Sequence, residues 1–327
     1  MAGMGKAQGA ASWIVSPGLA DAPVLDRLCS HFVLTLTLRQ LSAFSLRRDW
    51  AGLLGLVGRH LVWPAPVLGR LRGYLAKRCE GNPQWRGHAA LADAAFIRRH
   101  GEWRGPYEEG TLYFYLDEYL KDVPKDFAAL LSATCDWLGR DLKQQHTLVQ
   151  KNIDALAQLL QLNPAERAVL LYGTLARYQR ELRGLLVEFK VSSAQQAYAA
   201  IAQVAGVDAT EVAEALRAGG RLERIGMVEN LISEHNITDL ADLMKVSDQL
   251  PPVLMREYRG PDELMAVFTR PATRSSLTAA DFAFVADDAA VLTRLLRHAV
   301  ARGEAGVNIL LYGPPGTGKT ELAKVCA

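Results

Sequence analysis

The stretch Gly313-Pro314-Pro315-Gly316-Thr317-Gly318-Lys319-Thr320 decides how the C-terminal part of this chain folds. The apolar, β-prone residues 307–312 precede it, and residues 321–325 have the composition of the first turns of a helix. A strand, a loop of the pattern G-x-x-x-x-G-K-[ST] and a helix, in that order, form a phosphate-binding loop. A chance match to the pattern is the alternative, and the flanking segments make such a match rarer. We therefore predict a nucleotide site at residues 313–320.

The residues of this loop suit the chemistry of a phosphate site. Gly313, Gly316 and Gly318 permit backbone conformations and close approaches that a Cβ would block, so successive N–H groups can converge on a phosphate at a helix N-terminus. The Lys319 ammonium supplies positive charge to the β- and γ-phosphates, and the Thr320 hydroxyl is a candidate ligand for Mg²⁺. All residues from Gly313 to Thr320 are therefore candidate binding residues.

The loop and its surroundings also resemble the opening of an AAA+ ATPase module, in which Gly-Pro-Pro-Gly-Thr-Gly-Lys-Thr follows the first strand. The resemblance covers residues 277–327 and implies ATP and Mg²⁺ as cofactors. It further implies a homo-oligomeric ring that hydrolyses ATP between subunits and remodels a protein or nucleic-acid partner. In such modules the segment before the first strand helps to enclose the base, which makes Phe284 and Val285 candidate adenine contacts.

The catalytic residues that the resemblance implies are not in this sequence. In the family, the Walker B acids, the sensor, the arginine finger and the helical lid follow the loop, whereas this chain ends at Ala327. We therefore expect residues 1–327 to be the front part of a longer protein, with no catalytic residue and no significant ATP hydrolysis alone. A single strand also lacks the parallel neighbours that hold such a loop in shape.

Asp287 and Asp288 imitate Walker B acids because they follow the apolar residues 282–286. They precede the phosphate loop, however, whereas the Walker B acids of this family follow it. Carboxylates at the start of a helix complement its dipole and cap free N–H groups. We therefore predict that a helix begins at this point and extends to Arg302.

Composition limits the classes of protein to which the chain can belong. With 327 residues and 50% apolar content, it can bury two or three domain cores. A net charge of +2, with no basic block longer than pairs such as Arg47-Arg48, leaves DNA binding without support. No signal peptide or membrane-spanning run is evident. Four widely spaced cysteines read as free thiols in a reducing cytoplasm: Cys29, Cys79, Cys135 and Cys326.

The leucine-rich residues 1–190 are expected to be helical. Residues 32–38 also alternate as a strand would, and a helix is the preferred interpretation. Residues 108–121 are predicted to form a helix, and its cluster is expected to be core rather than a base-stacking platform: Leu112, Tyr113, Tyr115, Leu116 and Tyr119. Asn163-Pro164-Ala165-Glu166 indicates the N-terminus of a further long helix.

Residues 192–229 are similar to a winged helix-turn-helix. Residues 193–204 and 209–217 are helix candidates, with a tight turn and a cap at residues 206–208, and residues 221–228 are expected to be a strand or wing. In a DNA-reading version the second helix would carry basic or amide side chains. Here Asp208, Glu211 and Glu214 make it acidic, which favours protein docking or a structural role.

The sequence thus predicts a mainly α fold, with a helical region followed by the first strand, phosphate loop and helix of an α/β nucleotide-binding domain. We expect a helical region at residues 1–190, a winged-helix-like module at 191–270, a linker at 271–276 and an incomplete AAA+ domain at 277–327. The predicted protein is a cytoplasmic ATPase that binds a protein partner through its N-terminal region. The alternatives are an ATP-dependent regulatory or DNA-binding switch with little turnover, and an inactive fragment that still binds its partner.

Overall fold

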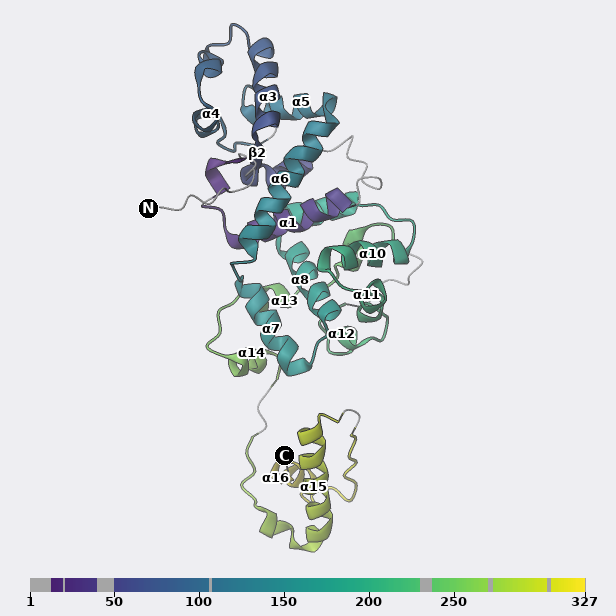
Figure 1. The fold of residues 1–327 in the computed structure, drawn as a ribbon. Helices are drawn as coiled ribbons and strands as arrows, with labels where there is room; N and C mark the ends of the chain where they lie inside the picture. The colour runs from purple at the N-terminus through teal and green to yellow at the C-terminus, as the bar shows by residue number, and fades with distance from the viewer. Residues whose placement is uncertain are drawn as a thin grey trace, which may run out of the picture. The chain divides into compact units, whose positions relative to one another are not determined.

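A computed structural model describes residues 13–19, 21–39, 50–105, 108–229, 237–269, 273–304 and 307–326. The chain divides into two compact units, Met1–Leu264 and Met265–Ala327, and the described part is mainly helical (Figure 1). Residues 271 and 272 of the expected linker lie outside the described residues, as do Arg47 and Arg48.

Helices make up most of the first unit. They are α1 (Val24–Arg39), α2 (Trp50–Val57), α3 (Ala65–Arg78), α4 (Asp93–His100), α5 (Leu112–Asp122), α6 (Pro124–Leu142), α7 (Leu148–Leu160), α8 (Pro164–Tyr178), α9 (Arg180–Glu188), α10 (Ala194–Ala205), α11 (Ala209–Ala215), α12 (Arg221–Arg224), α13 (Leu250–Leu254) and α14 (Pro261–Phe268), the last of which crosses the unit boundary. Shorter 3₁₀ turns lie at Pro17–Leu19, Gly58–His60, Pro83–Trp85, His88–Ala90 and Leu240–Leu243.

Two short strands tie the start of the chain to α6. β1 (Trp13–Val15) and β2 (Val62–Pro64) pair antiparallel, with Ile14 opposite Trp63. The buried Trp63 indole donates a hydrogen bond to Ser16 Oγ at 2.9 Å, and the Val62 N–H donates to Thr134 Oγ1 of α6 at 3.0 Å. Within the described residues the sheet consists of these two strands alone. It therefore links helices to one another and does not form a separate layer of the fold.

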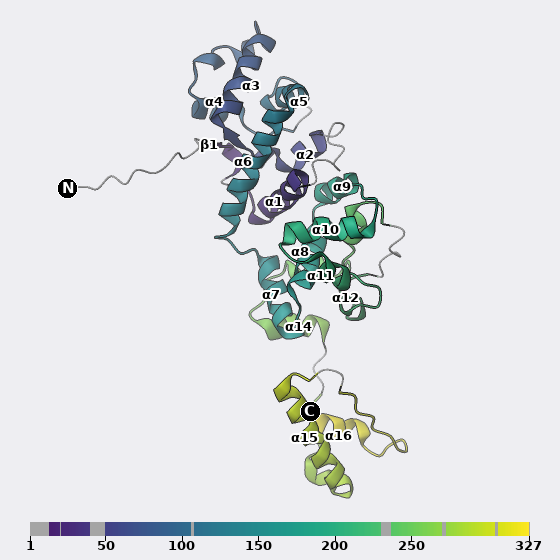
Figure 2. The same cartoon turned by 45° about the vertical axis from the view of Figure 1, so that its right-hand side comes forward.

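Helix α1 lies in the core, where α6, α9 and α10 pack against it (Figures 1 and 2). Phe32 is buried and stacks on Tyr172 of α8 with ring centroids 4.1 Å apart. Arg27 is buried and pairs with Asp141 of α6 at 2.5 Å. Because α1 has neighbours on several sides, apolar residues occupy most of its faces and mimic strand alternation. The helical interpretation of residues 32–38 is confirmed.

Helices α3, α4 and α5 gather at one end of α6 (Figure 1). The apolar and aromatic cluster of α5 is buried, as the sequence predicted, and Tyr113 donates a hydrogen bond to the Gly101 carbonyl at 3.0 Å. The helix begins at Leu112 rather than at residue 108, because the Thr111 hydroxyl accepts a hydrogen bond from the Phe114 N–H and caps the helix.

The predicted start of α8 is confirmed in atomic detail. Asn163 Oδ1 accepts from the Glu166 N–H at 2.8 Å, and Glu166 Oε2 accepts from the Asn163 N–H at 2.9 Å. This reciprocal pair, with Pro164 in the first turn, satisfies N–H groups that an uncapped helix would leave free.

The two helices predicted within residues 192–229 are present, whereas the predicted strand or wing is not formed. Helix α10 ends at Gly206, whose φ is +69°, and Asp208 caps α11 by accepting from the Thr210 N–H at 2.7 Å. Of residues 221–228, expected as a strand or wing, residues 221–224 form helix α12, which buries Leu222. Arg221 holds this turn in place by donating to the Leu160 carbonyl at 2.8 Å. Val228 forms an isolated antiparallel bridge with Val246, and it is the one residue of 221–228 that pairs in this way.

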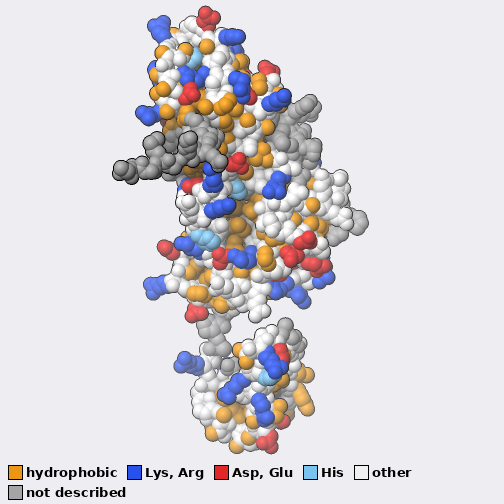
Figure 3. All heavy atoms as spheres, in the orientation of Figure 1, with side chains coloured by type: hydrophobic (Ala, Val, Ile, Leu, Met, Phe, Trp, Pro, Cys, Tyr) orange, Lys and Arg blue, Asp and Glu red, His pale blue; other side chains and the backbone are white. Residues whose placement is uncertain are grey.

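Acidic and basic side chains are interspersed over the visible face of the first unit (Figure 3). The four cysteines are free thiols, and Cys29, Cys79 and Cys135 are buried. Within the described residues, none of the helices combines the length and apolar character that crossing a membrane requires.

The second unit contains α15 (Ala286–Arg302) and α16 (Lys319–Cys326), with 3₁₀ turns at Ala279–Val285 packed against both helices. The Thr278 N–H and hydroxyl both donate to Asp281 Oδ2, at 2.7 and 2.9 Å, which fixes the start of these turns. Phe282 is the large side chain that this arrangement buries, at 2% exposure.

Candidate functional site

Three glycines shape the loop between residue 313 and α16. The φ angles of Gly313, Gly316 and Gly318 are +143°, +83° and +79°, in the region that L-residues with side chains rarely adopt. Pro314 and Pro315 lie between the first two glycines and contribute no N–H group. The sequence therefore places glycine where the backbone turns, and after Gly313 the N–H donors of the loop begin again at Gly316.

The Lys319 ammonium lies over the loop. Its Nζ donates hydrogen bonds to the carbonyls of Gly313 at 3.0 Å and Pro314 at 2.7 Å, and approaches Thr317 Oγ1 at 3.4 Å. The Thr317 hydroxyl itself donates to the Pro314 carbonyl at 2.9 Å. The Thr317 hydroxyl thus stabilises the turn, and the Lys319 ammonium links the end of the loop to the carbonyls at its beginning.

The loop N–H groups are available as donors. Within the described residues, the N–H groups of Gly316, Thr317 and Gly318 donate no backbone hydrogen bond, and the first bond into α16 runs from the Leu322 N–H to the Gly318 carbonyl at 2.8 Å. Thr320 is exposed in the first turn of α16. Free N–H groups at a helix N-terminus carry partial positive charge and attract anions.

Residues from the preceding segment support the loop. A Cβ on Gly318 would stand 3.2 Å from Phe282 Cε1, so the buried ring packs directly against that glycine. Ser275 Oγ donates to Glu321 Oε2 at 2.6 Å, and Lys324 pairs with Glu321 at 2.7 Å. The bonds from Lys324 and Ser275 lower the pKa of Glu321. Our reading of the sequence missed Phe282 and Ser275, which carry no motif.

The expected strand before the loop is not formed. Residues 307–312 belong to no strand, and Leu310 and Tyr312 are 83% and 88% exposed. A strand is defined by hydrogen bonds to a neighbour, and no neighbouring strand lies within the described part of this unit. The prediction of a strand here is therefore wrong for this chain.

The two candidate adenine contacts differ in how far they are exposed. Phe284 is 72% exposed and Val285 is half-buried, while the Phe282 and Phe284 rings lie 6.2 Å apart. Asp287 and Asp288 lie in the first turn of α15, so the prediction of a helix at these acids is confirmed.

The donor set matches the chemistry of a nucleotide phosphate. It combines free N–H groups at a helix N-terminus, an ammonium over the loop and an exposed hydroxyl on Thr320, which are the groups that phosphate oxygens and Mg²⁺ require. No cluster of three or more His, Cys, Asp or Glu residues suited to a metal occurs among the described residues.

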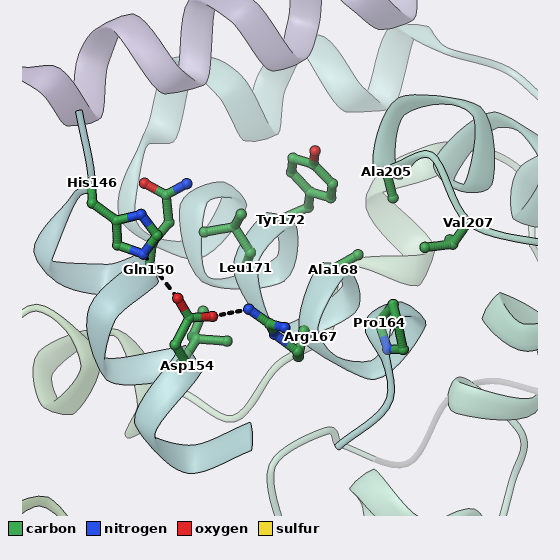
Figure 4. Close-up of a pocket in the computed structure, with 11 residues that line it drawn as sticks. His146, Gln150, Asp154, Pro164, Arg167, Ala168, Leu171, Tyr172, Ala205 and Val207 are labelled. Atoms are coloured by element: carbon green, nitrogen blue, oxygen red, sulfur yellow. Dashed lines mark hydrogen bonds and ion pairs between the residues drawn. The ribbon is translucent and has the colours of Figure 1, made fainter. Parts of the chain in front are cut away.

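A separate pocket in the first unit lies between α7, α8 and the turn before α11 (Figure 4). Its volume is about 230 Å³. Asp154 stands at its edge, accepting from His146 Nε2 at 2.8 Å in one bond and pairing with Arg167 in another. Because both oxygens of Asp154 are engaged and the Arg167 charge is balanced, this pocket offers less attraction to a charged ligand than the loop does.

Comparisons with protein-family models, with curated proteins and with solved structures found no match to this chain.

Proposed function

We propose that residues 277–327 bind ATP with Mg²⁺ as the opening of an AAA+ ATPase domain. The observation that carries this proposal is the loop itself, in which three glycines with positive φ lead into the N-terminus of α16 beneath the Lys319 ammonium. The N–H groups of residues 316–318 would hold the phosphate oxygens, and Lys319 would exchange its carbonyl partners for them. Bound Mg²⁺ would offset phosphate charge, with the Thr320 hydroxyl as its ligand from this chain.

In the complete ring that the family resemblance implies, binding at this loop would drive ATP hydrolysis between subunits and remodelling of a partner. The helical first unit would then select the partner. A regulatory switch with little turnover and an inactive fragment that binds its partner are the alternatives.

We assign the α10–α11 pair to protein contact rather than to DNA. Asp208, Glu211 and Glu214 are exposed on this pair, and Arg217 lies close to Glu214, at 3.5 Å. An acidic helix repels a phosphate backbone. Binding to duplex DNA should be weak, without sequence preference, and should fade between low and moderate salt. A sequence-specific footprint that survives moderate salt would contradict the assignment.

The test of ATP binding is a titration of the chain with a fluorescent ATP analogue, with and without Mg²⁺, for the parent, Lys319→Ala and Lys324→Ala. Lys324 is the control on the same helix, because its ammonium pairs with Glu321 at 2.7 Å rather than with the loop carbonyls. We expect Lys319→Ala to weaken binding about tenfold or more, since it removes a charge-assisted contact to phosphate. Equal affinities for the parent and Lys319→Ala would remove the loop as the nucleotide site.

A further inference from the structure

A hollow of about 700 Å³ runs along the first unit between α1 and the C-terminal half of α6. Residues 31–39 of α1 form one side, and residues 135–143 form the other, with Trp13 and Val204 completing the lining. We call it the α1/α6 groove. It lies in the unit that does not contain the phosphate loop, so it is independent of the proposed ATP site.

The floor of the groove is uncharged. Burial lowers the pKa of His31 and raises the pKa of the Cys135 thiol, so both groups are neutral near pH 7. The Thr35 hydroxyl is turned to its own helix and donates to the His31 carbonyl at 2.8 Å. Gly139 leaves the floor open, because a Cβ there would stand only 3.0 Å from His31 Nε2.

The rim of the groove is positively charged. Arg39, Arg140 and Lys143 line it against a single carboxylate, Asp136. Arg140 uses its Nε to donate to the backbone carbonyl of Asp136 and places its guanidinium over the Trp13 ring at 4.3 Å. Within the described residues, none of the three cations forms an ion pair.

A structural role explains only part of this arrangement. Arg39 ends α1 and Lys143 follows α6, and cations at helix C-termini stabilise the helix dipole. That effect also applies to Arg140, which lies in the last turn of α6, so it explains the basic residues at the two helix ends. It does not explain why a hollow with an uncharged floor lies between them.

We propose that the α1/α6 groove binds an extended, acidic peptide segment of a partner protein. Residues 31–39 span roughly 12 Å at 1.5 Å per residue, the length of about four extended residues. Apolar side chains of such a segment would face the floor, and its carboxylates would meet Arg39, Arg140 and Lys143. A nucleic-acid strand fits less well, because bases need several aromatic surfaces, and Trp13, the groove's one aromatic side chain besides His31, is already covered by Arg140.

The experiment measures fluorescence anisotropy of a labelled peptide of alternating glutamate and leucine, with the lysine–leucine peptide and a labelled oligothymidylate as comparisons. The full chain is tested as the parent, as Arg39→Glu/Lys143→Glu and as Lys125→Glu. Lys125 is the matched control, since it is an exposed cation at the opposite end of α6. Thermal melts establish that each variant is folded, and Lys143→Glu alone replaces the double variant if the latter unfolds.

We expect the acidic peptide to bind the parent and Lys125→Glu equally, and to bind the double variant about tenfold or more weakly, with affinity falling as salt rises. The lysine peptide should not bind. Three results would overturn the proposal: no saturable binding of the acidic peptide, equal binding by the double variant, or tighter binding of the oligothymidylate that the same variant abolishes.

Discussion

The buried ring of Phe282 packs against Gly318, where an added Cβ would stand 3.2 Å from Phe282 Cε1. The Phe282 ring therefore leaves little room for a side chain at position 318. The positive φ of Gly318 separately disfavours any residue that has a side chain. Both constraints apply at a residue whose N–H group we propose as a phosphate donor.

Replacing Gly318 with alanine should accordingly weaken ATP binding. The new side chain adds roughly 1–2 kcal/mol of strain at positive φ and forces the Phe282 ring to move. Gly206→Ala is the matched control, because Gly206 has a φ of +69° but no atom within 4 Å of an added Cβ. Titration with the fluorescent ATP analogue should show a loss for Gly318→Ala and none for Gly206→Ala. Equal affinities for Gly318→Ala and the parent would contradict the packing argument.

The alanine variants of Thr320 and Lys319 should both bind ATP more weakly, but only one of the two deficits should depend on Mg²⁺. Thr320→Ala deletes a proposed metal ligand, so its affinity deficit should appear in Mg²⁺ and largely vanish in EDTA. Lys319→Ala deletes a phosphate contact, so its deficit should persist without metal. Thr320→Ser keeps the hydroxyl and should restore binding. A deficit for Thr320→Ala of the same size in EDTA would argue against a metal ligand at this position.

The parts of the fold that the sequence predicted well are those set by local chemistry. The Asn163 and Glu166 cap and the Gly206–Asp208 turn depend on residues within a few positions, and both are confirmed. The failures depend on distant contacts. Residues 221–224 are helical because Leu222 is buried and Arg221 contacts the carbonyl of Leu160, which no local pattern reveals.

The candidate sites follow the same division. The loop of residues 313–320 is continuous in the sequence, so its glycines and Lys319 can be recognised without a structure. Its support from Phe282 comes from outside the motif, and the α1/α6 groove joins helices whose Arg27 and Asp141 are 114 residues apart. Such a groove becomes visible only when the packing is known. The strand expected at residues 307–312 failed for the same kind of reason, since a strand requires a hydrogen-bonded neighbour from elsewhere in the chain.

Acidification should destabilise the first unit through buried histidines. Burial lowers the pKa of His60 to about 4 and also lowers the pKa of His88 and of His100. One nitrogen of each of the three rings is buried with no hydrogen-bond partner in the structure. Below pH about 6.5 these imidazoles bind protons in the unfolded chain but remain neutral in the folded chain. The free energy of unfolding therefore falls as the pH falls from about 6.5 toward 4. For His60 alone, the loss is up to about 3 kcal/mol.

Urea unfolding followed by tryptophan fluorescence measures this effect, because all 6 tryptophans lie in the first unit. The transition midpoint should fall between pH 7 and pH 5, and His60→Gln should reduce the slope of that fall. His146→Gln is the control, since His146 lies half-exposed at a pocket edge. A midpoint that stays constant over this range would contradict a neutral buried His60.

Gly58 and Gly73 should respond in opposite directions to the same substitution. A Cβ on the buried Gly58 would stand 2.1 Å from Trp103 Cζ3, closer than any real contact, so Trp103 must leave its packing against Tyr113. Gly58→Ala should therefore destabilise the first unit by about 1–3 kcal/mol.

Gly73 lies exposed within α3 with no atom within 4 Å of an added Cβ. Gly73→Ala should therefore stabilise the first unit by roughly 0.5–1 kcal/mol through helix propensity. Parallel urea titrations of the two variants against the parent decide the matter. If Gly58→Ala unfolds at the same urea concentration as the parent, the close packing of Trp103 over Gly58 must be abandoned.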